Sequence, residues 1–199
     1  MDNPINRNLK KQSTGIVGLN HLLEGGFPIG NLIMVYGSPL VGLELMTRQF
    51  WNVAKEDGTY LMNEGSMEAG MVDASELHPE MYLPKMIGSR IVVDSLSSIV
   101  IRYGIDGTIK FLRLAREEIQ MRGGNLMFII YTNIHAPVEM MRLMRMADIV
   151  IELKMETHQK EIERTLTVHK IKDSAAPQRQ LPYIITDNGI EVSTTSRVV

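Results

Sequence analysis

The sequence predicts an α/β domain in which a mainly parallel, twisted sheet is flanked by helices and ends in an antiparallel extension. Short apolar runs without polar interruption predict strands that are buried on both faces. These runs alternate with segments whose apolar residues recur at helical spacing. Near its end the chain instead alternates apolar and polar residues, which is typical of antiparallel strands. The expected buried strands are 32–36, 91–93 and 126–131, and further strands are expected at 59–62 and 149–153.

Helices are expected where apolar residues return every three or four positions between the strands. Pro137 favours the start of one helix, and the glycine pair at 123–124 favours the end of another. Residues 63–89 have no clear period, and we expect a helix near 68–77 followed by a loop. The other expected helices are a single turn at 21–24 and longer segments at 43–56, 106–122 and 137–146.

Residues 164–171 alternate apolar and polar side chains and predict an antiparallel edge strand. Two short apolar segments, 183–186 and 190–192, flank an Asn-Gly pair, which is a strong turn signal, and predict a C-terminal hairpin. Residues 1–12 are polar and predict a flexible lead-in, so that residues 13–199 form a single domain.

Composition excludes several classes of protein. The chain has 199 residues, a formal net charge of −2 and no cysteine. It therefore has no disulfide, thiol nucleophile, thiolate zinc site or iron–sulfur cluster. The five histidines show no metal-binding spacing, so no metal site is expected. The charge gives no general attraction for a polyanion, and we expect no nucleic acid partner. No signal peptide or membrane span is visible, which predicts a cytoplasmic protein without membrane contacts.

The segment after the first buried strand has the frame of a phosphate-binding loop, G-x-x-x-x-G-K-[ST], between a strand and a helix. In such loops, backbone N–H groups and the lysine hold the phosphates, while the hydroxyl holds Mg²⁺. Here Leu43 stands at the lysine position and Glu44 at the hydroxyl position. The candidate nucleotide-binding loop comprises Gly37, Ser38, Pro39, Leu40, Val41, Gly42, Leu43 and Glu44.

These two replacements oppose nucleotide binding, because the loop loses a cation and gains an anion. Two unit charges about 4 Å apart interact by roughly 4 kcal/mol at an effective dielectric constant near 20. A helix dipole offers only about 0.3–1 kcal/mol. Leu40 and Val41 are also bulky where small residues usually let a phosphate approach. No cofactor is therefore expected, although coordination of Mg²⁺ by Glu44 leaves weak MgATP binding open.

Three further motifs extend the interpretation beyond the loop. Residues 13–30 carry S-T-G-I-V-G-L-N, a leucine pair and G-G-F-P-I-G. Residues 90–97 read R-I-V-V-D-S-L-S, and residues 181–192 read L-P-Y-I-I-T-D-N-G-I-E-V. In this order the motifs closely resemble the RecA/RadA superfamily, above all its KaiC branch, over residues 13–192. The resemblance implies a RecA-like P-loop NTPase fold.

The resemblance also implies functional positions. Asp94 matches the Walker B aspartate that supports Mg²⁺ through water; from the residues alone, a cap for the next helix is the alternative. Glu64 matches the first of two glutamates that active relatives carry, one of which activates the attacking water, and Gly65 replaces the second. Lys170 and Lys172 match a basic pair that reaches the γ-phosphate of a neighbouring subunit, with solvated edge-strand residues as the alternative.

The expected function is regulatory. The sequence predicts an inactivated homologue of RecA/KaiC ATPases, with no catalytic residue, rather than an enzyme. KaiC-like paralogues are abundant in archaea, and by analogy the chain would act as a regulator or scaffold in archaeal signal transduction. The expected partners are copies of itself, a RecA/KaiC-like paralogue or a signalling protein. Two alternatives stay open: a weak ATP-binding module that supplies Lys170 and Lys172 in trans, and a DNA-binding recombination accessory.

Overall fold

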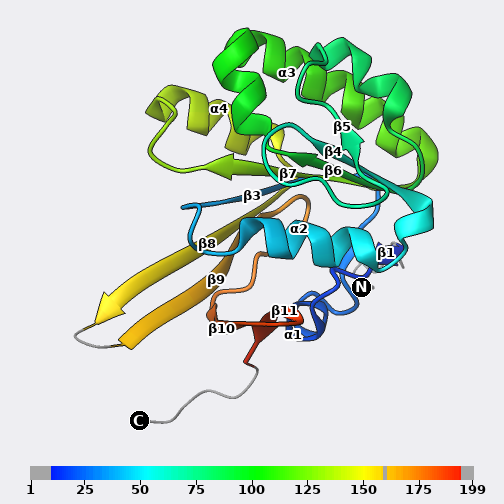
Figure 1. Ribbon diagram of the computed structural model, residues 1–199. Helices are drawn as coiled ribbons and strands as arrows, with labels where there is room; N and C mark the ends of the chain where they lie inside the picture. Colours follow the sequence, from blue (N-terminus) through cyan, green and yellow to red (C-terminus); the bar gives the residue numbers. More distant parts are fainter. Residues whose placement is uncertain (1–9, 159–160, 194–199) are drawn as a thin grey trace, which may run out of the picture.

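The computed structural model describes residues 10–158 and 161–193. Within these residues, nine strands form one sheet in the order β11-β10-β9-β8-β3-β7-β6-β4-β5 (Figure 1). Strands β3 to β8 pair in parallel, whereas β8, β9, β10 and β11 pair with one another as antiparallel neighbours. The predicted fold class, with its parallel body and antiparallel C-terminal part, is therefore confirmed.

The strands are β1 (Lys11–Gln12), β2 (Phe27–Pro28), β3 (Leu32–Gly37), β4 (Gly58–Met62), β5 (Val72–Asp73), β6 (Arg90–Asp94), β7 (Asn125–Tyr131), β8 (Ile149–His158), β9 (Glu161–Ile171), β10 (Gln180–Thr186) and β11 (Gly189–Val192). The helices are α1 (Val17–Leu22), α2 (Leu43–Asn52), α3 (Leu96–Arg122) and α4 (Pro137–Met146). Short 3-10 turns are η1 (Lys55–Asp57), η2 (Pro79–Met81) and η3 (Leu83–Lys85).

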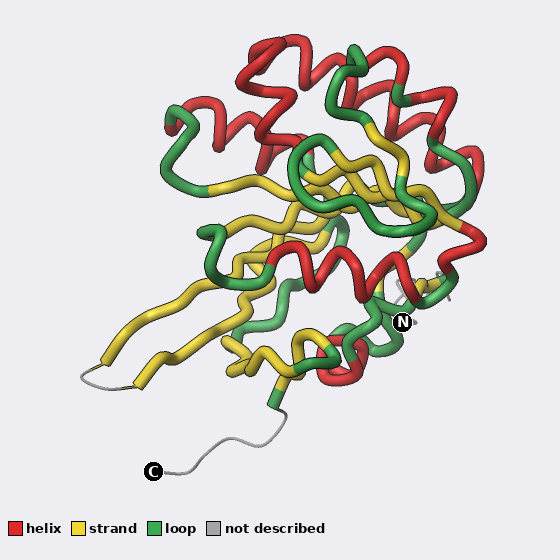
Figure 2. The backbone as a smooth tube through the Cα atoms, in the orientation of Figure 1, coloured by secondary structure: helices red, strands yellow, loops and turns green. Residues whose placement is uncertain are grey.

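Helices cover both faces of the sheet, as Figure 2 shows. One face packs against α3 and α4, and the other packs against α1, α2 and the hairpin of β10 and β11. β3 lies in the middle, and its residues alternate between the two cores: Met34 faces α3 and α4, while Ile33 and Val35 face α2. This explains why β3 is apolar without interruption, since neither face meets solvent.

The helix expected near 68–77 is wrong. Val72 and Asp73 instead form β5, a short parallel strand beside β4 at the edge of the sheet. Gly70 has a left-handed backbone (φ 92°), which does not fit an α-helix. Beyond it, prolines in η2 and η3 limit the chain to single turns.

The expected edge position of residues 164–171 is also wrong. β9 lies between β8 and β10, because Thr165–Thr167 pair with Gln180–Pro182. Pro182 hid this pairing, since a proline within a run argues against a strand. The C-terminal hairpin itself is confirmed, with Tyr183 opposite Val192.

Several boundaries differ from expectation. α3 begins ten residues early, at Leu96, because it continues across a break at Gly104 (φ 71°, ψ 168°) that interrupts its period. α2 ends at Asn52, α1 lies at Val17–Leu22, and β8 runs on to His158. Of the expected lead-in, residues 1–9 lie outside the described residues, and Lys11–Gln12 form β1 against β2.

Candidate functional site

The candidate loop occupies the predicted place between the central strand and a helix. β3 ends at Gly37, Gly42 adopts a left-handed conformation (φ 85°), and α2 begins at Leu43. The loop therefore lies at the carboxyl edge of the parallel strands, where open α/β sheets commonly bind ligands. β6 and β7 end at the same edge and bring Asp94 and Tyr131 to it.

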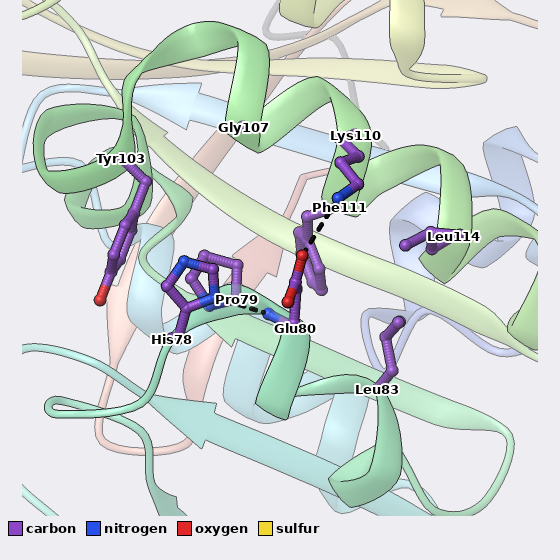
Figure 3. A pocket seen from close by; sticks show the side chains of 9 residues that line it. All are labelled: His78, Pro79, Glu80, Leu83, Tyr103, Gly107, Lys110, Phe111 and Leu114. Carbon is purple, nitrogen blue, oxygen red and sulfur yellow. Dashed lines mark hydrogen bonds and ion pairs between the residues drawn. The ribbon is translucent and has the colours of Figure 1, made fainter.

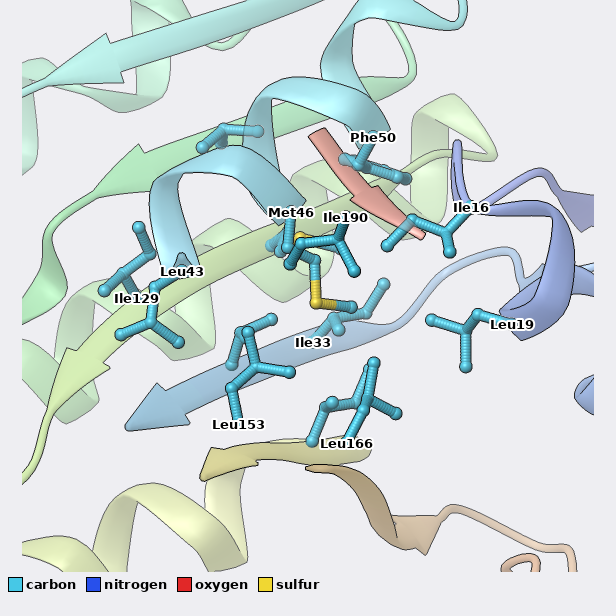
Figure 4. Packing of buried hydrophobic residues seen from close by; sticks show 14 of the residues in the cluster. Ile16, Leu19, Ile33, Leu43, Met46, Phe50, Ile129, Leu153, Leu166 and Ile190 are labelled. Atoms are coloured by element: carbon cyan, nitrogen blue, oxygen red, sulfur yellow. The ribbon is translucent and has the colours of Figure 1, made fainter. Parts of the chain in front are cut away.

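The side chain at the lysine position belongs to the hydrophobic core. Leu43 is fully buried and packs in the core under α2, together with Met46, Ile129 and Leu153 (Figure 4). Its loop neighbour Val41 is buried as well, and its carbonyl oxygen accepts a hydrogen bond from the Tyr183 hydroxyl at 2.7 Å. Both residues therefore stabilise the fold by burying apolar surface.

Leu40 is the exposed apolar residue of this loop, with 68% of its surface accessible. Pro39 beside it is exposed too. Gly37 must be small, because a Cβ there would lie 2.4 Å from the carbonyl oxygen of Leu153. The two glycines of the motif thus serve the turn and the close approach of β8, whether or not a ligand binds.

Glu44 is held by a tyrosine from the neighbouring strand. The Tyr131 hydroxyl donates a hydrogen bond of 2.6 Å to Glu44 Oε1, and burial together with this carboxylate raises the pKa of Tyr131. The backbone N–H of Tyr131 donates in turn to the Ser97 hydroxyl at 2.9 Å. Glu44 is thus a fixed acceptor at the mouth of the loop.

Asp94 is buried beside this pair. Its Oδ2 accepts a 2.6 Å hydrogen bond from the Tyr60 hydroxyl, which also contacts Thr47 Oγ1 at 2.9 Å. Its Oδ1 is equally buried and has no hydrogen-bond partner. The pKa of Asp94 is raised to about 6, mainly by burial; the Tyr60 hydrogen bond opposes this rise, and the charges of Glu44 and Glu64 contribute to it.

Asp94 does not cap the next helix. The N-cap of α3 is Ser95, which makes no side-chain cap hydrogen bond. Glu64 is exposed in the loop after β4, close enough for its charge to act on Asp94. The nearby cation Arg48 also acts on Asp94, but its guanidinium is engaged with Glu68 at 3.0 Å. The edge is therefore predominantly acidic.

The two lysines of the expected basic pair lie at the opposite edge of the sheet. Lys170 pairs with Val150, near the start of β8, whereas the loop follows the end of β3. Lys170 Nζ donates to the carbonyl oxygens of Met144 (3.1 Å) and Ala147 (2.5 Å) at the end of α4. Burial lowers its pKa. Within its own chain Lys170 therefore caps α4 and does not approach the loop.

Lys172 is half-exposed and lies 3.8 Å from Asp148 Oδ1. Asp148 is buried, and its other carboxylate oxygen accepts from the Leu32 backbone and from Arg116. Lys172 thus borders an ion-pair cluster that joins the starts of β3 and β8.

A cavity lies elsewhere, between η2, η3 and α3 (Figure 3). It has about 240 Å³, an apolar floor that includes Phe111 and Leu83, and a rim on which Lys110 pairs with Glu80 at 3.1 Å. Among residues 10–158 and 161–193, no cluster of acidic, histidine or cysteine side chains is arranged to hold a metal ion. No helix within these ranges is long and apolar enough to cross a membrane.

Comparison with known families establishes the relationship. A family model described as "ATPase: KaiC" matches residues 72–197, which is more than half of the chain. The chain belongs to this KaiC-like ATPase family. The matched part of the KaiC-like chain contains Asp94, Lys170 and Lys172, whereas the candidate loop and Glu64 precede it.

Two further comparisons agree with this assignment. A stretch of 59 residues is 36% identical to a UPF0273 protein of Thermotoga maritima; it covers 28% of this KaiC-like chain and 24% of that relative, about a quarter of its length. The crystal structure of a KaiC-like protein from the archaeon Pyrococcus horikoshii matches with a TM-score of 0.77, over 93% of this chain and 99% of that one, at 20% identity. The RecA-like fold is therefore confirmed.

The sequence located the loop and Asp94 but not the groups that hold them. Tyr60 and Tyr131 lie on different strands, and only the tertiary fold brings their hydroxyls to Asp94 and Glu44, with Thr47 of α2 bonded to the Tyr60 hydroxyl. Nothing in their local spacing distinguishes them from tyrosines and threonines that simply pack in strands and helices.

Proposed function

We propose that this KaiC-like protein does not hydrolyse ATP and that it acts as a regulatory or scaffold protein, through contacts with other proteins. The observation that carries the proposal is Leu43, which stands where a phosphate loop needs its lysine and is fully buried in the core. An ammonium group at this position is replaced by apolar packing, so the loop offers no side-chain cation to a phosphate.

The charges around the loop support the same conclusion. Glu44 occupies the position of the Mg²⁺-binding hydroxyl and already accepts a hydrogen bond from Tyr131. A phosphate oxygen about 4 Å from this carboxylate would be repelled by roughly 4 kcal/mol at an effective dielectric constant near 20. The helix N-terminus would return only about 0.3–1 kcal/mol. The residues present therefore do not fit a magnesium–nucleotide complex, and we derive no hydrolytic step.

The test is the thermal unfolding midpoint with and without millimolar MgATP or MgADP. A ligand present at about 100 times its Kd stabilises the fold by roughly 2.7 kcal/mol, which raises the midpoint by several degrees. We expect no rise with either nucleotide. An active KaiC-like ATPase measured in parallel serves as the positive control. A clear rise in this chain would refute the proposal and favour a nucleotide-binding module.

Hydrolysis is tested separately. We expect the purified protein to release no more phosphate from ATP than the Asp94→Asn variant, in which the Walker B-like carboxylate is neutral. Equal residual rates in both proteins identify a contaminating ATPase. A rate that is lost only in the variant would show that the chain is an enzyme.

The regulatory part is tested with an active KaiC-like paralogue of the same organism. We expect a stoichiometric titration of this chain to change the paralogue's ATPase rate, because a scaffold acts by assembling with its partner. If the change required Lys170 and Lys172 in trans, their alanine variants would abolish it. Lys170 is engaged with α4, so the pair is not available to act together in trans. We therefore expect Lys172→Ala to leave the effect on the paralogue's ATPase rate intact. No change in rate at any ratio would remove this role.

A further inference from the structure

The cavity between η2, η3 and α3 owes its shape to one face of α3. Gly107, Lys110, Phe111 and Leu114 line it, and they recur at positions i, i+3, i+4 and i+7, which lie on the same side of a helix. Figure 3 shows this face turned toward the segment that carries η2 and η3. Because Gly107 has no side chain, the helix face is hollow there.

Packing does not require a glycine at position 107. The backbone is helical, and a Cβ would make only ordinary contact, 3.6 Å from Tyr103 Cβ. A glycine inside a helix costs about 0.5–1 kcal/mol relative to alanine. The chain thus gives up stability at a position that lines a cavity, and such a loss is typical of sites that serve binding.

A buried tyrosine fixes the opposite wall of the cavity. Tyr82 stands between η2 and η3, is 2% exposed, and packs edge-on against Phe111 with ring centroids 5.6 Å apart. Its hydroxyl donates a 2.6 Å hydrogen bond to Asn63 Oδ1. These contacts hold the two turns against α3 and leave about 240 Å³ between them, so the cavity is formed before any ligand binds.

The size and the walls of the cavity favour a single aromatic side chain. Small-molecule sites usually have about 300–1,000 Å³, so this smaller cavity suits one anchoring side chain of a partner better than a nucleotide. The floor of Phe111 and Leu83 is apolar. His78 and Tyr103 add a second ring pair, with centroids 4.8 Å apart. A further ring can pack edge-to-face against these rings.

The rim carries polar groups that suit the same ligand. Lys110 Nζ and Glu80 Oε1 are 3.1 Å apart, and both side chains are more than half exposed. An ammonium group attracts the face of an aromatic ring, and a carboxylate accepts a hydrogen bond from an indole N–H or a phenol O–H. The cavity can therefore contact both the apolar body and the polar edge of a tryptophan or tyrosine side chain.

We propose that this cavity binds a tryptophan or tyrosine side chain of a protein partner. The inference rests on the proposed function, because it gives the regulatory or scaffold role a contact with its partner. This contact is separate from the candidate loop. Phe111 belongs to the core on the α3 face of the sheet, whereas Leu43 belongs to the core on the α2 face.

The probe is N-acetyl-tryptophanamide, followed by chemical shifts of the backbone amides in residues 78–83 and 103–114. N-acetyl-leucinamide is the apolar control without a ring, and free L-tryptophan forms a third arm. We expect saturable shifts with the tryptophan amide, and about tenfold weaker binding of the leucine amide. Equal affinity for the two amides would overturn the proposal. Shifts with free L-tryptophan alone would mean a metabolite site and would overturn it too.

Matched variants locate the contact. Gly107→Leu puts a side chain on the hollow helix face, and we expect it to abolish binding of the tryptophan amide while the protein stays folded, because leucine is a good helix former. Glu117→Leu adds the same side chain at an exposed position of α3 outside the cavity and should leave binding unchanged. Lys110→Gln alters only an exposed side chain and should weaken binding about threefold, because the cation is lost.

The two proposals fail in different ways. A thermal shift with MgATP refutes the proposed function whatever N-acetyl-tryptophanamide does. Absence of shifts at the highest soluble concentration of this amide refutes only the cavity site. Binding that is unchanged in both Gly107→Leu and Lys110→Gln also refutes it, because the aromatic ring would then bind elsewhere.

Discussion

At the residue scale, the Asp94 carboxyl lies in surroundings that oppose its ionisation. Its pKa is raised from an ordinary value of 3.8 to about 6, mainly by burial, with smaller contributions from the charges of Glu44 and Glu64. Between these two pKa values, the folded state holds a proton that the unfolded state has released. The contribution of Asp94 to the free energy of unfolding therefore falls as the pH rises from about 4 to about 6, and is constant above that range.

We expect Asp94→Asn to remove this dependence. The difference in free energy of unfolding, variant minus natural protein, should be larger at about pH 7.5 than at about pH 4.5 by roughly 2 kcal/mol. The variant is thus relatively more stable at the higher pH. Urea denaturation at the two pH values measures the difference, with the exposed-residue variant Glu117→Gln as control. A difference that is the same at both pH values would contradict the raised pKa.

At the scale of elements, α3 carries two glycines with opposite roles. Gly104 has φ 71° and ψ 168°, a conformation that residues with a Cβ rarely adopt, although no atom would meet the Cβ. Gly107 is helical, and a Cβ there would make ordinary contact with Tyr103 at 3.6 Å. The same substitution at the two positions should therefore change stability in opposite directions.

Gly104→Ala should lower the free energy of unfolding by about 1–3 kcal/mol, because the backbone conformation becomes strained. Gly107→Ala should raise it by about 0.5–1 kcal/mol, because alanine is the better helix former. Urea denaturation of both variants gives the comparison. If Gly104→Ala were stabilising, the helix would run through this position without the break.

The end of α4 is the element that distinguishes the two lysines of β9. Lys170 donates to carbonyl oxygens at that end, while Lys172 lies 3.8 Å from Asp148 with half of its side chain exposed. We expect Lys170→Met to lower the free energy of unfolding by about 1 kcal/mol and Lys172→Met by less than about 0.5 kcal/mol. Equal effects in thermal or urea unfolding would mean that the α4 contacts of Lys170 add nothing to stability.

At the scale of the whole molecule, local patterns predicted most of the parallel body because β3, β4, β6 and β7 are buried on both faces. The uninterrupted apolar run of β3 is the clearest case. Local patterns failed where a strand's pairing partner was not recognisable as a strand and where a segment has no apolar period. β9 appeared to be an edge because its partner β10 begins with Gln180–Pro182, and residues 63–89 owe their course to glycine and proline rather than to periodicity.

The candidate site likewise has features that local sequence predicts and features that depend on tertiary contacts. Spacing alone located the loop at 37–44 and Asp94 at the end of β6, because both follow buried strands. The burial of Leu43 and the hydroxyl donors of Tyr60 and Tyr131 depend on contacts between elements far apart in sequence. No local pattern carries that information, which is why the sequence predicted the loss of a cation but not how the remaining carboxylates are held.

The commitment of Leu43 to the core makes a last prediction about the whole fold. The double variant Leu43→Lys/Glu44→Thr restores the motif's lysine and hydroxyl. Because Leu43 is fully buried, we expect the lysine to cost about 3 kcal/mol in the free energy of unfolding, even though its stem can remain among apolar neighbours. Glu44→Thr alone should change stability by less than about 1 kcal/mol.

We further expect neither variant to gain a rise in the unfolding midpoint with millimolar MgATP. The loop is packed through Val41 and Leu43 and bonded to Tyr183 from β10, so two side chains do not by themselves rebuild a phosphate cradle. A rise of several degrees in the double variant only would contradict this reasoning. It would mean that the loop backbone is still competent, and that the identity of residues 43 and 44 alone separates this chain from a nucleotide-binding relative.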